Sequence, residues 1–276
     1  IILLLLLSHA AVTTAQPASG QGVLRASLRN GLRVVIVQNS LAPVVTTVVN
    51  YLVGANESPE GFPGMAHAQE HMMFRGSPGL SAAQLANIIA LMGGEFNADT
   101  QQTVTRYFFT VPREYLDVAL HVEAVRMRDV LDAEDLWAQE RGAIEQEVAQ
   151  DLSNPEYLFS MRLIAELFAG TPYARDALGT RPSFQKTTGA MLKKFYHAWY
   201  APNNAILVVV GDVDPPTTLS KVRELFEPIP KRPIPARAAI KLQPLKPAVI
   251  TLDTSLPNGL AVVAFRLAGI AGPDFG

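Results

Sequence analysis

The sequence predicts an α+β fold in which a mixed or antiparallel sheet is covered by helices. Three features predict this class: an Asn-Gly turn between two alternating apolar stretches near the start, further β-rich runs, and long segments with helical periodicity. The chain has 276 residues, 49% of them hydrophobic and 17% charged, which supplies ample material for a buried core. A globular protein is therefore expected.

The strands are predicted from alternation and from turn residues. Asn30-Gly31 lies inside "LRASLRNGLRVVIVQN", between two apolar stretches, and this arrangement indicates a β-hairpin. Further strands are predicted at Val44 to Val53, at Phe96 to Thr100, at Val104 to Val111 and in the apolar run "AILVVVGDVD".

The helices are predicted from apolar periodicity and from capping residues. Ser81 and Gln84 form a capping box for a helix that ends near Met92, before two glycines. The other helices are predicted at Pro63 to Gly76, Tyr115 to Asp129, Asp132 to Asp151, Glu156 to Phe168, Ala190 to Trp199 and Pro215 to Phe226.

Composition divides the chain into four parts. Residues 1–20 open on the apolar run Ile1 to Leu7, too short for a membrane span of about 20 residues, so they are expected to be a signal peptide and tail; a retained anchor is the alternative. Residues 21–227 form the predicted first domain. Six of the 20 prolines lie between Pro228 and Pro247, so residues 228–247 are predicted to be a linker. Residues 248–276 are expected to hold the first strands of a second domain, without the helices to cover them.

Charge and cysteine content exclude several kinds of site. The net charge is −2 with both signs scattered, so no basic surface is available for nucleic acid, which is not expected as a partner. The chain has no cysteine, which excludes disulfides and thiolate metal sites. Any transition-metal site must therefore use His, Asp or Glu.

The segment "GMAHAQEHMMFRG", from Gly64 to Gly76, carries the most specific motif. On a helix His67 and His71 are four residues apart, so both imidazoles can reach one ion, and Glu70 lies between them. H-x-x-E-H is the order of the inverzincin motif, in which the Glu is the base and the third ligand comes from a distant helix. By itself the motif is weak, because two histidines at this spacing also occur as ordinary surface or core residues.

A second helical segment, "QERGAIEQEVAQD", carries three carboxylates. Glu140 and Glu147 are seven residues apart and share one helical face, whereas Glu145 points elsewhere. An H-x-x-E-H motif followed some 75 residues later by an E-R-x-x-I-x-x-E helix resembles the pitrilysin-type zinc metallopeptidase family, which includes insulin-degrading enzyme and the mitochondrial processing peptidase.

Two other segments resemble the same family. Phe96-Asn97-Ala98-Asp99-Thr100 resembles its "FNAxT" strand beside the active site, and Pro202-Asn203-Asn204 leading into "LVVVGDVD" resembles its closing strand. The likeness runs from about Leu28 to the end of the chain. It implies the N-terminal catalytic half of a pitrilysin/LuxS-type metallopeptidase, with the start of a second pitrilysin-like domain at residues 248–276.

The resemblance also implies roles for single residues. Glu147 would be the third ligand of one Zn²⁺ per chain, and Glu140 a carboxylate that orients a ligand or water. Asn97 and Ala98 would belong to a strand that receives substrate. Two of these residues also have a structural explanation without a catalytic role. Glu140 also fits a solvated helix face, and Asn97 the edge of a turn. The implied activity is that of a zinc-dependent endopeptidase, located in the periplasm or secreted, which hydrolyses extended peptides or unfolded polypeptides through a zinc-activated water.

The implied partners are the peptide substrate and either a missing C-terminal half or a homologous partner subunit. In the family that half closes over the first and usually contributes an Arg and a Tyr, so the chain alone is expected to be weakly active or inactive. Two alternatives stay open: a non-catalytic pitrilysin-like subunit that binds peptides or assembles a complex, and an unrelated exported α+β binding protein. No stable membrane span is expected.

Overall fold

The computed structural model describes residues 22–254, 257–267 and 269. The expected leader, residues 1–20, lies outside them. Within the described residues, no helix has both the length and the apolar character needed to cross a bilayer.

In the part of the chain that the structure describes, six strands form one mixed sheet in the order β1-β2-β8-β3-β7-β6. Their bounds are β1 Val23–Ser27, β2 Arg33–Gln38, β3 Val44–Tyr51, β6 Glu95–Thr100, β7 Thr105–Pro112 and β8 Ala205–Gly211. β2 and β8 are parallel and every other neighbouring pair is antiparallel. A separate two-stranded ribbon joins β4 (Gly76–Ser77) to β5 (Leu80–Ser81). The predicted α+β class with a mixed sheet is confirmed.

The predicted Asn-Gly hairpin joins β1 to β2. The Leu28 N–H donates to the Leu32 carbonyl over 2.8 Å, and Gly31 has φ +90°, a left-handed conformation that glycine adopts without strain. Asn30 is buried, and its side-chain amide donates to the Phe226 carbonyl over 2.7 Å. The turn therefore also fastens the end of the last helix to the sheet.

The last strand in the sequence, β8, lies near the middle of the sheet, between β2 and β3. Burial alternates along it, with Leu207 and Val209 fully buried and Ile206 and Val208 partly exposed. The buried positions belong to the face that the helices cover.

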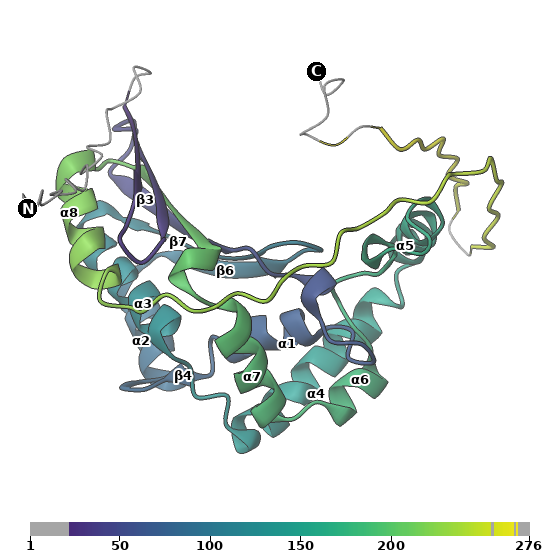
Figure 1. The fold of residues 1–276 in the computed structure, drawn as a ribbon, viewed down its shortest axis with the longest axis horizontal. Helices are drawn as coiled ribbons and strands as arrows, with labels where there is room; N and C mark the ends of the chain where they lie inside the picture. The colour runs from purple at the N-terminus through teal and green to yellow at the C-terminus, as the bar shows by residue number, and fades with distance from the viewer. Residues whose placement is uncertain (1–21, 255–256, 268, 270–276) are drawn as a thin grey trace, which may run out of the picture.

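Helices cover one face of the sheet (Figure 1). Those that pack directly on strands of this six-stranded sheet are α1 (Met65–Met72) against β6, α3 (Leu116–Arg128) against β3 and β7, and α8 (Pro215–Phe226) against β1 and β2. An outer group consists of α2 (Ala82–Met92), α4 (Glu134–Asp151), α5 (Pro155–Leu167), α6 (Arg181–Lys186) and α7 (Gly189–Trp199). α4 and α7 both contact α1, so the shortest of the sheet-packing helices is enclosed between the sheet edge and two outer helices.

The capping box predicted for α2 is present. Ser81 Oγ accepts from the Gln84 N–H over 3.2 Å, and Gln84 Oε1 accepts from the Ser81 N–H over 2.8 Å. Gly93, with φ +63°, ends the helix as expected. The short helix α6 and the β4–β5 ribbon were not predicted, because elements of six and two residues carry too little periodicity to detect.

Part of the proline-rich segment is anchored to the domain rather than free. Ile229 is fully buried, the Arg232 guanidinium lies 5.1 Å from the centre of the Tyr196 ring, and that of Arg237 lies 4.9 Å from Trp199. The prolines exclude regular structure, but apolar burial and two stacked arginines still fix the path of the backbone. A boundary near residue 227 stays a prediction.

In the described part of residues 248–276, the expected strands are not seen. Residues 248–254, 257–267 and 269 run without helix or strand. A short extended segment buries too little surface to form strands by itself, which accounts for the difference.

Candidate metal centre

Helix α1 begins where two glycines meet. Gly64 and Gly179 both have φ +86°, and a Cβ built on Gly179 would lie 2.5 Å from the Gly64 Cα. Only glycine at both positions lets the loop before α6 approach the start of α1 so closely. In this helix every residue except His71 is buried, so the enclosed position of α1 fixes its side chains.

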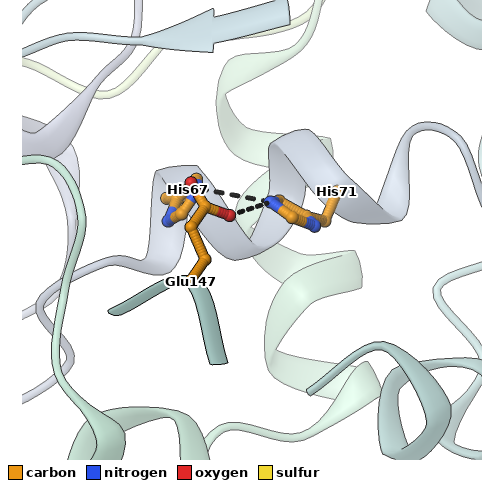
Figure 2. Close-up of side chains that lie close together, drawn as sticks. All are labelled: His67, His71 and Glu147. Carbon is orange, nitrogen blue, oxygen red and sulfur yellow. Dashed lines mark hydrogen bonds and ion pairs between the residues drawn. The ribbon is translucent and has the colours of Figure 1, made fainter. Parts of the chain in front are cut away.

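His67, His71 and Glu147 come together at one point, with Glu147 reaching from α4 toward two imidazoles of α1 (Figure 2). The two Nε2 atoms are 3.2 Å apart, and Glu147 oxygens lie 3.5 Å from His67 Nε2 and 3.3 Å from His71 Nε2. A tetrahedral zinc ion with bonds of about 2.0–2.2 Å needs ligand atoms roughly 3.3–3.6 Å apart. Glu147 presents a different oxygen to each imidazole, and one donor atom from each of the three residues lies within 4.8 Å of the others, so the group has the chemistry of a zinc site and is gathered closely enough to form one.

The second nitrogen of each imidazole has its own partner. His67 Nδ1 lies 3.0 Å from the Leu178 carbonyl, and His71 Nδ1 lies 2.8 Å from Glu140 Oε1. Both partners accept hydrogen bonds, so each Nδ1 carries a proton, and each ring in its neutral form would present the Nε2 lone pair to the common point. Glu140 is buried and also pairs with Arg75. It therefore contacts an imidazole without joining the three-residue cluster.

Glu70 lies beside the cluster and makes a different contact. Its Oε2 accepts a hydrogen bond from the Thr100 hydroxyl over 2.5 Å. Burial raises the pKa of Glu70, while the Thr100 hydrogen bond and the two imidazoles oppose that rise. A carboxylate whose pKa is moved toward neutrality is suited to accept a proton and release it again.

The remaining predicted residues lie on β6 and on the far side of α4. Asn97 and Ala98 lie on the outermost strand of the sheet, next to α1, and the Ala98 N–H donates to Asn97 Oδ1 over 2.8 Å. Glu145 points away from the cluster and pairs with Arg181 over 3.0 Å, as the helical spacing predicts.

Three contacts of the site were not anticipated from the sequence. The Leu178 carbonyl belongs to the backbone and has no sequence signature. Arg75 lies beyond the end of α1 and reaches Glu140 on α4, a long-range contact that no local spacing indicates. Thr100 ends the "FNADT" segment, whose significance came only from a resemblance.

Without a metal the cluster holds protons instead. Burial lowers the pKa of His71, but hydrogen bonds to Glu140 and Glu147 outweigh it and raise that pKa from 6.5 to about 9. Hydrogen bonds from His67 and His71 hold the pKa of Glu147 well below its usual range. A protonated His71 beside an ionised Glu147 is thus the metal-free counterpart of a filled site.

Zinc affinity is therefore expected to rise with pH. Zinc needs neutral imidazole, so below pH 9 it must displace at least the His71 proton, and the apparent affinity should increase about tenfold per pH unit from pH 6 to 9. Competition against a fluorescent chelator, corrected for the chelator's own protonation, measures this slope. In Glu140→Gln one carboxylate that raises the His71 pKa is absent, so the rise should level off at lower pH. An affinity unchanged between pH 6 and 8 would contradict the proton displacement.

Two family models match the chain. Residues 33–181 match insulinase (peptidase family M16), and residues 186–274 match the peptidase M16 inactive domain. The first match contains all three cluster residues. The second begins just before α7 and includes β8, which lies between β2 and β3, so both matched segments contribute to the same sheet.

Proteins named zinc proteases are similar in sequence. Zinc protease PqqE of Helicobacter pylori is 32% identical over 203 residues, which cover 73% of this chain and 46% of that protein. An uncharacterized zinc protease of Mycobacterium bovis is 31% identical over 214 residues, 77% of this chain and 48% of that protein. The chain spans about half the length of these relatives.

Solved structures show the same architecture. A protease from Helicobacter pylori superposes with a TM-score of 0.74 at 29% identity, covering 80% of this chain and 54% of that one. The periplasmic protease PqqL from Escherichia coli gives a TM-score of 0.76 at 23% identity, covering 83% and 26%, which shows the fold alone. Together with the insulinase match over residues 33–181, more than half of the chain, these likenesses confirm the resemblance to the pitrilysin-type proteases: the chain belongs to the insulinase (M16) family of peptidases.

Proposed function

We propose that this chain is the zinc-carrying half of an endopeptidase that hydrolyses extended peptides. The observation that carries the proposal is the cluster of His67, His71 and Glu147, in which one donor atom from each residue lies within 4.8 Å of the others, with the carboxylate of Glu70 beside it. His67, His71 and Glu147 would hold zinc, and Glu70 stays available as a base. When bound, zinc lowers the pKa of a water molecule toward 7 and polarises a carbonyl.

The protein groups account for the proton movements of the reaction. Glu70 takes a proton from the attacking water as its oxygen bonds to the peptide carbonyl carbon. It then gives a proton to the amine nitrogen as the C–N bond breaks. Glu140 keeps the His71 ring oriented through Nδ1, and the Leu178 carbonyl does the same for His67. Water is consumed, and one acid and one amine are formed.

The free edge of β6 is the proposed place for substrate. An extended peptide could add to this edge as a further strand, held by backbone hydrogen bonds that read little sequence. The Ala98 N–H is suited to donate to the peptide, because its present acceptor is the exposed side chain of Asn97 rather than a neighbouring strand. Asn97 would move its Oδ1 aside when a peptide carbonyl takes its place.

Unfolded substrates should be cut and tightly folded ones spared, because strand addition needs an extended backbone. The measurement compares turnover of one protein in its native form and in a reduced or truncated unfolded form, by the full-length zinc-loaded protein. A proline at a position that donates to β6 should slow cleavage, since it removes the donor. Equal rates on both forms would contradict this mode of binding.

A second half is proposed to complete the enzyme, since the chain spans about half the length of its relatives. The 276-residue chain should bind zinc yet turn over peptides poorly, and adding the rest of the protein, fused or in trans, should raise turnover about a hundredfold or more. The physical reason is that groups which stabilise the developing oxyanion and exclude water act only when positioned around the substrate. Zinc content and turnover are measured at equal concentrations, and full activity of the chain by itself would contradict the proposal.

A non-catalytic subunit is the rival function, and the match to an inactive domain bears on it. That match covers residues 186–274, which contain none of the proposed zinc ligands, nor Glu70. The insulinase match covers them all. The complete set of donors therefore favours the peptidase.

We propose a periplasmic or secreted location as well. It is supported by the leader-like apolar run in residues 1–20 and is compatible with the periplasmic description of PqqL from Escherichia coli. Fractionation of cells that express the tagged full-length protein tests this location.

A further inference from the structure

The Thr100 hydroxyl donates its hydrogen bond to Glu70, the proposed base. Its nearest acceptors are Glu70 Oε2 at 2.5 Å and Thr105 Oγ1 at 3.4 Å. Thr105 uses its own hydrogen on the Val53 carbonyl, over 2.9 Å. A hydroxyl has one hydrogen, and an ionised carboxylate only accepts, so the hydrogen of Thr100 points to Glu70.

A second contact holds α1, the helix that carries Glu70, against β6, the strand that carries Thr100. Phe74 and Phe96 pack with ring centroids 5.5 Å apart. Phe74 follows Glu70 by four residues on one face of α1 and its continuation, and Phe96 precedes Thr100 by four residues on one face of β6. α1 therefore lies against β6 at two points, one apolar and one polar.

We propose that Thr100 is a positioning residue for Glu70, which links the base to the strand proposed to receive the peptide. The terminal torsion of a glutamate is soft, so burial alone does not orient the carboxylate. Holding Oε2 leaves Oε1 to accept a proton, since Oε2 is the only Glu70 oxygen with a hydrogen bond among the described residues. The inference rests on the proposed peptidase function and adds a residue to it.

The strand gives this contact a further consequence. Among the described residues β6 pairs with β7 alone, and it carries both the proposed peptide edge at Asn97 and Ala98 and the hydroxyl of Thr100. A peptide that pairs with the free edge restrains the strand on both sides. The strand proposed to receive the peptide therefore also carries, two residues after Ala98, the hydroxyl that holds the base.

The test uses the full-length zinc-loaded protein and an unstructured reporter peptide. Thr100→Val keeps the shape and removes the hydroxyl, so kcat should fall about 10- to 100-fold while KM and zinc content stay within about twofold, because misorientation of a reacting group acts on the chemical step. Thr100→Ser restores the donor and should stay within about threefold of the wild type. Thr100→Ala serves as a second variant without the hydroxyl.

Thr110→Val is the matched control. Thr110 lies on β7, and its hydroxyl pairs with Thr46 over 2.9 Å, away from Glu70, so the same substitution should leave kcat unchanged. Peptide affinity, measured by fluorescence anisotropy in Glu70→Gln with and without Thr100→Val, should be equal in the two proteins. Equal affinity assigns the effect to the chemical step rather than to binding.

Three results would overturn the assignment: wild-type turnover in both Thr100→Val and Thr100→Ala, loss of zinc in either, or an equal loss of turnover in Thr100→Ser. A zinc-loaded wild type that cuts no unfolded polypeptide would instead overturn the peptidase function itself. The wild-type measurement therefore separates failure of the function from failure of the role of Thr100.

Discussion

Replacing Glu70 by Gln is expected to lower peptide turnover of the full-length protein by about 10²–10⁴-fold while zinc stays bound. The amide matches the carboxylate in shape but cannot accept the proton of the attacking water. Zinc should be retained, because Glu70 lies outside the three-residue cluster. Turnover of an unstructured peptide and zinc per chain are measured on the same preparation.

Glu145→Gln is the matched control for this substitution. It makes the same chemical change on α4, where Glu145 pairs with Arg181 and points away from the cluster. Turnover and zinc content should both be unchanged. Near-normal turnover of Glu70→Gln would show that another group acts as the base.

Local structure was largely predictable because its causes are local. The hairpin at Asn30-Gly31 follows from backbone conformations that Asn and Gly adopt, and the start of α2 follows from a Ser and a Gln three residues apart. The position of β8 between β2 and β3 was not predictable from its own residues. A continuous apolar strand fits many places in a sheet, and its neighbours are selected by long-range packing.

The candidate site was predictable for a different reason. His67, Glu70 and His71 are neighbours on one helical turn, so their spacing alone places them together. Glu147 had to come from another helix: helical spacing set Glu145 apart, and only the resemblance distinguished Glu147 from Glu140. In the structure Glu147 faces both imidazoles, whereas Glu140 faces the outer nitrogen of one.

Contacts made by backbone atoms, or between residues far apart in the chain, leave no recognisable pattern in the sequence. The Leu178 carbonyl reaches His67 only because Gly64 and Gly179 let two segments approach closely. In the same way, the density of prolines after residue 227 indicated a linker, but the burial of Ile229 and the stacking of Arg232 depend on partners far away in the sequence.

The charge of the site gives a physical reason for a divalent cation. With both imidazoles neutral, the carboxylates of Glu70, Glu140 and Glu147 carry three negative charges, and Arg75 offsets one of them. Glu70 and Glu140 are buried, where uncompensated charge is costly. A divalent cation at the point shared by His67, His71 and Glu147 would neutralise the two negative charges that remain.

Replacing Glu147 by Gln should therefore remove both a ligand atom and a charge that attracts the ion. Zinc affinity should fall by more than about a hundredfold, whereas Glu140→Gln, which alters only the outer contact to His71, should cost about 10- to 100-fold. Both affinities are measured by chelator competition at one pH, with Glu145→Gln as the variant of equal charge change on the same helix. Turnover should fall with zinc occupancy in Glu147→Gln and recover partly at high zinc, which separates loss of the metal from loss of the base in Glu70→Gln.

Two results would contradict these roles. Wild-type zinc affinity in Glu147→Gln would show that the ion is held without the carboxylate of α4. A weaker zinc site in Glu140→Gln than in Glu147→Gln would show that Glu140 is the ligand and Glu147 the outer contact.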